Sequence, residues 1–173
     1  MTSFRIQSSR HNGFTLLEVL IALLVMSIGL LGIGKMMMLS ARANDSAYMR
    51  SQATALAYTM LDAMRANRQA AIVQGYDTAM GVFPAAAAAC GTVASPCNSG
   101  QQAQTDLWQW GNTLGVALPL GAGSVTTVTA PDTSTGAPNI TATIVVQWSD
   151  KVAEQSFGSA AGNIISITLE TVL

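Results

Sequence analysis

The sequence predicts an α+β fold, in which one long N-terminal helix packs against a small antiparallel β-sheet. The first observation is a dense apolar block over residues 14–39 that continues as an amphipathic pattern, with no proline between Phe14 and Val82. The second is a change of period to two after Gly123, which is typical of half-buried strands. The 173 residues carry a formal net charge of −1, so we expect one domain beyond the apolar block and no contact with nucleic acid.

The N-terminal segment combines a short basic stretch with an apolar helix. Arg5 and Arg10 precede the apolar block, and cations on this side favour a cytoplasmic N-terminus. Between Phe14 and Leu39 the block carries two charges, Glu18 and Lys35. A helix over these residues would be about 39 Å long at about 1.5 Å per residue, which is enough to cross a bilayer core of about 30 Å.

Three kinds of segment share this pattern: a secretory signal, a plain membrane anchor and a prepilin signal. Glu18 separates them, because a carboxylate near the bilayer centre costs on the order of a few kcal/mol and a secretory signal has no reason to keep one. The side chain could extend to the cytoplasmic surface, or it could meet a cation of another subunit. The match Ala41-Arg42-Ala43 leaves ordinary signal cleavage after Ala43 as an alternative.

Residues 13–18, with the sequence GFTLLE, closely resemble the cleavage site of type IV prepilins and pseudopilins. The resemblance implies that a prepilin peptidase cuts after Gly13 and methylates the new N-terminus at Phe14. It also makes Glu18 the fifth residue of the mature chain. In a filament of staggered helices, Glu18 of one subunit would pair with the Phe14 amine of its neighbour and fix the register of assembly.

The helical pattern extends beyond the membrane block. An amphipathic stripe consists of Met49, Ala53, Leu56, Met60 and Ala63 or Met64. Cations and acids lie on or around the polar side at Arg42, Asp45, Arg50, Asp62, Arg65 and Arg68. We therefore expect a helix from about Phe14 to about Ala71, and a chain divided into a leader (1–13), a membrane and assembly half-helix (14–39), an exported half-helix (40–71) and a head (72–173). Glycines 29, 32 and 34 predict either local melting or close helix packing.

The first part of the head, residues 72–123, is expected to be irregular. Cys90 and Cys97 predict a disulfide that closes a short loop if the head is exported, with two free thiols as the alternative. Thr105 could begin a short helix with Leu107, Trp110 and Leu114 on one face. Trp108 and Trp110 fit either the core or a recognition surface.

The second part of the head is expected to form the sheet. Val125–Thr129 is a short β-prone run, and the best strand alternates inward residues at Ile140, Ala142, Ile144, Val146 and Trp148. A last strand alternates Ile165, Ile167 and Leu169 with polar residues, and Asp150–Gly162 would connect the two.

The head is also similar to the PilV group of minor pilins. The similarity lies in residues 50–57, 61–67, 75–76, 106–110, 118–121 and 146–148. It implies a PilV-like minor pilin that primes and joins a type IV pilus, which supports twitching motility and surface attachment. The implied partners are the prepilin peptidase and methyltransferase, major and other minor pilins, an inner-membrane assembly platform and a tip adhesin. The implied location is the inner membrane, single-pass with a periplasmic head, and then the pilus, at its tip.

Other functions have less support in the sequence. A type II secretion pseudopilin shares the same N-terminus, and an adhesin or ligand-binding head on a membrane anchor is compatible with the filament role. Catalysis is not expected, because the single histidine, His11, lies in the leader and no nucleophile and base pattern is present. Two cysteines without a histidine in the head also predict no metal site, and no cofactor is expected.

Overall fold

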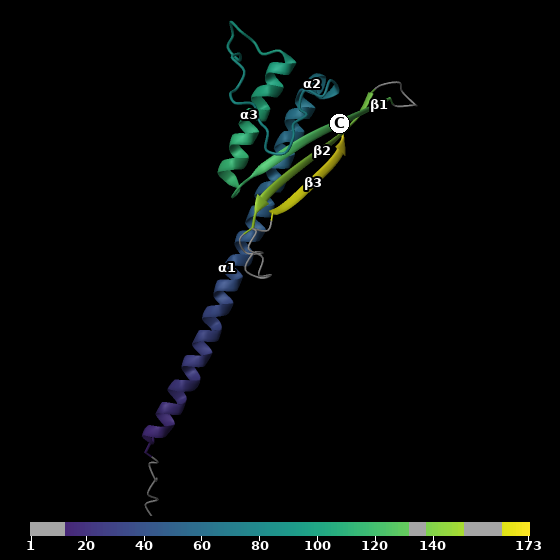
Figure 1. Ribbon diagram of the computed structural model, residues 1–173. Helices are drawn as coiled ribbons and strands as arrows, with labels where there is room; N and C mark the ends of the chain where they lie inside the picture. The colour runs from purple at the N-terminus through teal and green to yellow at the C-terminus, as the bar shows by residue number, and fades with distance from the viewer. Residues whose placement is uncertain (1–12, 132–137, 151–163) are drawn as a thin grey trace, which may run out of the picture. The chain divides into compact units, whose positions relative to one another are not determined.

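The computed structural model describes residues 13–131, 138–150 and 164–173. These residues form helices α1 (Leu16–Ala66), α2 (Arg68–Ile72) and α3 (Ser99–Ala117), and strands β1 (Ala122–Pro131), β2 (Pro138–Ser149) and β3 (Ile164–Val172) (Figure 1). The chain divides into two compact units, Met1–Arg42 and Ala43–Leu173, and α1 contributes residues to both. The predicted α+β fold, a long N-terminal helix packed against a small antiparallel sheet, is confirmed.

In the first unit, α1 exposes all of its large apolar side chains. The least exposed between Leu16 and Leu39 is Val19, at 44%. The helix continues through glycines 29, 32 and 34, so the local melting considered for this stretch is not found. A Cβ atom at any of these glycines would meet no atom within 4 Å. The described residues therefore give no packing reason for glycine at these positions.

In the second unit, α1 buries the predicted amphipathic stripe. The buried residues of α1 are Ala53, Leu56, Ala57, Met60, Leu61 and Met64. Met49, one helical turn earlier than Ala53, packs against the same core. The apolar period of three to four residues thus identified the face of the helix that the sheet and α3 cover.

The long helix ends earlier than the predicted Ala71. It stops at Ala66, and α2 begins at Arg68 after Asn67, whose φ of −120° and ψ of 52° are not helical. The Asn67 amide donates hydrogen bonds to the Ser99 carbonyl (2.8 Å) and to the Tyr76 hydroxyl (3.2 Å). Both partners belong to later parts of the chain. The helix therefore breaks at Asn67 where this residue makes contacts outside the helix, and the apolar periodicity of the sequence does not show this break.

Helix α3 is longer than predicted and begins earlier. Its N-cap is Asn98, whose side chain accepts from the Gln101 N–H (2.8 Å) while the Gln101 side chain accepts from the Asn98 N–H (3.0 Å). This reciprocal capping box fixes the start of the helix. The predicted start at Thr105 is wrong: its hydroxyl lies within the helix, donates to the Gln101 carbonyl (3.0 Å) and accepts from the Ala88 N–H (3.2 Å).

The sheet is an antiparallel meander in the order β1-β2-β3. All three strands were predicted, and each is longer than its predicted core. The inward residues of β2 that the alternation identified are all fully buried. Ser46 of α1 donates a hydrogen bond to Asp150 at the end of β2 (2.5 Å). The predicted connection Asp150–Gly162 lies outside the described residues, apart from Asp150 itself.

Trp110 belongs to the core and not to a recognition surface. It is 4% exposed, its indole N–H donates to the Leu56 carbonyl (2.9 Å), and its ring packs edge-on against Phe83. Trp108, two residues earlier, is half-buried. The buried indole N–H of Trp148 has no hydrogen-bond partner among the residues that the structure describes.

The two buried tryptophans are expected to respond differently to replacement by phenylalanine. Trp110→Phe removes a buried hydrogen bond, whereas Trp148→Phe removes an unsatisfied N–H whose burial costs about 1–3 kcal/mol. We expect Trp110→Phe to lower the free energy of unfolding by about 1–2 kcal/mol more than Trp148→Phe. Urea unfolding of the full chain in detergent micelles, followed by circular dichroism, measures both. Equal losses would contradict this account.

Candidate functional site

The predicted processing site lies just before helix α1. Gly13 and Phe14 are exposed, and Phe14 is 82% accessible. The helix begins at Leu16, where the Glu18 N–H donates to the carbonyl (3.1 Å) and the hydroxyl (3.3 Å) of Thr15. Thr15 therefore acts as the N-cap. The Gly13–Phe14 bond is outside the helical ladder, on exposed backbone of the kind that peptidases cut most readily.

Gly13 is not required by the fold around it. A Cβ atom at this position would meet no atom within 4 Å, and its φ is not in the left-handed region. Any requirement for glycine at this position must therefore come from another molecule. A peptidase pocket that admits no side chain would impose such a requirement.

Glu18 lies in the first turn of α1 and is exposed among apolar side chains. A carboxylate near a helix N-terminus interacts favourably with the helix dipole. The helix is long and apolar enough to cross a membrane. A single carboxylate on such a surface requires either water or a cation, and α1 presents it one turn after the N-cap.

A partly buried polar cluster around Tyr76 lies in the second unit and was not predicted. The Tyr76 hydroxyl donates to Asp106 (2.6 Å) and accepts from the Asn67 amide (3.2 Å). Gln102 donates to the other oxygen of Asp106 (2.7 Å). Burial, reinforced by Asp106, raises the pKa of the Tyr76 phenol well above its ordinary value, so the phenol stays a proton donor. The cluster joins the end of α1 to α3 and has a structural role.

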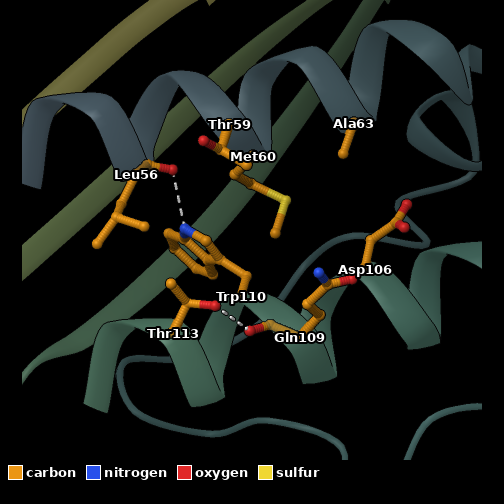
Figure 2. A pocket seen from close by; sticks show the side chains of 8 residues that line it. All are labelled: Leu56, Thr59, Met60, Ala63, Asp106, Gln109, Trp110 and Thr113. Atoms are coloured by element: carbon orange, nitrogen blue, oxygen red, sulfur yellow. Dashed lines mark hydrogen bonds between the residues drawn. The ribbon is translucent and has the colours of Figure 1, made fainter. Parts of the chain in front are cut away.

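A small pocket lies between α1 and α3, beside this cluster (Figure 2). Its volume is about 140 Å³. The lining residues are Leu56, Thr59, Met60, Ala63, Asp106, Gln109, Trp110 and Thr113. Ligand sites for cofactors and drug-sized molecules occupy about 300–1,000 Å³, so this pocket is too small for either. We therefore do not assign a cofactor to this pocket.

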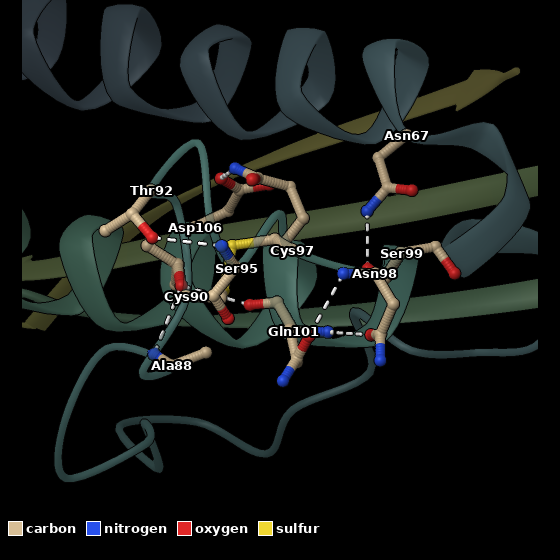
Figure 3. The surroundings of a disulfide bond; sticks show 12 residues. Asn67, Ala88, Cys90, Thr92, Ser95, Cys97, Asn98, Ser99, Gln101 and Asp106 are labelled. Carbon is tan, nitrogen blue, oxygen red and sulfur yellow. Dashed lines mark hydrogen bonds between the residues drawn. A yellow bond between two sulfur atoms is a disulfide. The ribbon is translucent and has the colours of Figure 1, made fainter.

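Cys90 and Cys97 form a disulfide in the second unit, just before α3 (Figure 3). The residues between them are exposed, and the Gly91 N–H donates to the Ser95 carbonyl (2.9 Å). Asn98, which caps α3, follows directly after Cys97. The disulfide therefore closes a surface loop beside the start of a helix.

The predicted site residues are divided between the two units. Gly13, Phe14 and Glu18 lie in the first unit, and the two cysteines lie in the second. Among the described residues, no group of three or more histidine, cysteine or acidic side chains could hold a metal ion. The predicted residues that belong to a contiguous sequence motif, Gly13, Phe14 and Glu18, lie just before α1 or in its first turn.

The comparisons with known proteins point to the same segment. Residues 8–34 match the family described as the prokaryotic N-terminal methylation motif, which is typical of type IV pilin-like proteins and pseudopilins. Neither the curated proteins nor the solved structures gave a significant match to the chain. The match covers the predicted processing site and α1 as far as Gly34, and it does not extend to the head.

Proposed function

We propose that the chain is a PilV-like minor pilin that is processed at the inner membrane and built into a type IV pilus. The observation that carries the proposal is the methylation motif over residues 8–34, which includes the exposed residues Gly13 and Phe14 and an exposed apolar helix. In this proposal a prepilin peptidase cuts after Gly13 and methylates Phe14. The role is structural, not catalytic.

The exposed part of α1 supports the assembly role. An apolar surface of this extent must be covered by lipid before assembly and by other helices afterwards. Glu18 would then pair with the Phe14 amine of the next subunit. The head, with its disulfide, would be periplasmic and would contact major and minor pilins or a tip adhesin.

A type II secretion pseudopilin is the second candidate, because the same motif is found in that group. Both candidates require the same processing. They differ in the structure that takes up the subunit, so co-purification of the tagged chain with sheared surface pili, lost when the major pilin is deleted, favours the minor pilin.

Processing is expected to yield a chain that begins at Phe14 and carries one added methyl group. Intact mass and N-terminal sequencing of the chain purified from its native membrane measure both features. Gly13→Leu is expected to keep residues 1–13, because a side chain at this position blocks the peptidase and not the fold. Gly29→Ala, which also meets no neighbouring atom, is the matched control and should be processed normally.

Two outcomes would contradict the proposal. A chain that begins at Asn44 would show ordinary signal cleavage after Ala43 and leave no membrane helix. Normal processing of Gly13→Leu would show that cleavage does not depend on this residue.

A further inference from the structure

The outer edge of β1 is covered by residues that precede α3. Thr78 and Val125 exchange backbone hydrogen bonds (2.9 and 3.1 Å), and the Gly81 N–H donates to the Gly123 carbonyl (3.0 Å). Further along the strand, the Asp77 carboxylate accepts from the Thr127 N–H (2.9 Å). Edge strands invite pairing with other chains, and this arrangement prevents such pairing at β1.

The register between β2 and β3 shows which backbone N–H and C=O groups of β3 face β2 and which face away from the sheet. The Leu173 N–H donates to the Ile140 carbonyl of β2 (2.8 Å), and the register continues without a bulge from Val172 to Ile164. Backbone N–H and C=O groups alternate in direction along an antiparallel strand, so the odd-numbered residues of β3 form the backbone hydrogen bonds with β2. The even-numbered residues direct their N–H and C=O groups away from the sheet. These are Ile164, Ser166, Thr168, Glu170 and Val172.

The outer edge of β3 is open within the described residues. The outward N–H groups have no hydrogen-bond partner there, and the one contact of an outward carbonyl is a long one from Thr171 to its neighbour Val172 (3.4 Å). The strand has no proline or lysine, and Glu170 is its one charge. The even-numbered side chains are all exposed, with Ile164 at 65% and Val172 at 58%. Of the features that usually prevent an edge strand from pairing with another chain, such as proline and charged residues, β3 has only the carboxylate of Glu170.

We propose that the open edge of β3 binds an extended segment of another protein chain as an added antiparallel strand, with a basic side chain opposite Glu170. Charge complementarity selects the basic residue, because Glu170 is exposed and forms no ion pair in the described part of the chain. The other face of the added strand is apolar, since it continues the half-buried row of Ile165, Ile167 and Leu169. This inference does not depend on the proposed function.

The test uses a labelled probe peptide of alternating threonine and valine with one lysine opposite Glu170, and a second peptide with glutamate in that place. Fluorescence anisotropy measures binding to the full chain in detergent micelles. The lysine peptide is expected to bind more tightly, and Glu170→Lys is expected to reverse the order. Thr168→Pro removes an outward N–H and should weaken both peptides at least about tenfold, while the melting temperature stays unchanged.

Thr129→Pro is the matched control, because its N–H also faces outward, but from β1, whose edge is covered at Gly123, Val125 and Thr127. It should leave peptide binding unchanged. The proposal is overturned if neither peptide binds, if charge has no effect, or if Thr168→Pro binds as well as the unmodified chain. It is also overturned if the chain self-associates and Thr168→Pro abolishes this, since the edge would then belong to a second copy.

Discussion

Glu18→Gln is expected to leave cleavage after Gly13 intact and to reduce incorporation of the chain into filaments at least about a hundredfold. In the proposed assembly, the Glu18 carboxylate pairs with the Phe14 amine of a neighbour inside a low-dielectric bundle of helices. Removing one member of a buried ion pair leaves an uncompensated charge and costs about 3–5 kcal/mol, which corresponds to at least about a hundredfold in an equilibrium constant. The amide keeps the shape of the side chain, so a loss of packing does not explain the effect.

Lys35→Gln is the matched control, because Lys35 is the other charge between Phe14 and Leu39. It should be incorporated nearly as well as the unmodified chain. Quantitative immunoblots of sheared filaments and of membranes measure the partition of each variant. Normal incorporation of Glu18→Gln would contradict the pairing role of Glu18. It would not affect the proposed processing at Gly13, which the mass measurement tests separately.

Gly121→Ala is expected to destabilise the head by about 3 kcal/mol. A Cβ atom at Gly121 would lie 2.2 Å from the Leu114 carbonyl oxygen and 2.9 Å from the Leu114 carbonyl carbon. Both are backbone atoms near the end of α3, where the Leu118 N–H also binds the Leu114 carbonyl (3.0 Å). The contact can be relieved only by moving the helix end or the start of β1, and both are attached to the core.

Gly115→Ala provides the matched control within α3. A Cβ atom there meets nothing within 4 Å, so the variant should be stabilised by about 1 kcal/mol through helix propensity alone. Urea unfolding in micelles, followed by tryptophan fluorescence, compares the two variants. If Gly121→Ala proves as stable as the unmodified chain, the close approach of α3 and β1 is wrong.

Local periodicity was sufficient to predict the sheet and the buried face of α1. Each inward residue of β2 follows an alternation that is visible in the sequence, and the stripe of α1 repeats at helical spacing. The start of α3 was missed because residues 99–104 have almost no apolar period. A signal was nevertheless present, since Asn98 and Gln101 have the spacing of a capping box.

The features that could not be predicted depend on residues far apart in the chain. Asn67 interrupts a periodic helical run, and its partners Tyr76 and Ser99 belong to other elements. The pair of Tyr76 and Asp106 is separated by 30 residues. The processing residues could be predicted because their signal is a contiguous motif, and that assignment stays a prediction. The open edge of β3, by contrast, becomes visible only when the register is known.

The head has a consequence for its own synthesis. Leu56 accepts from Trp110, which lies 54 residues later, and Ser46 binds Asp150, which lies 104 residues later. At about 5–20 residues per second, the ribosome needs about 5–20 seconds to supply the last of these partners. The apolar stripe of α1 stays uncovered during this time. A nascent chain therefore exposes this stripe until its C-terminal strands have been synthesised.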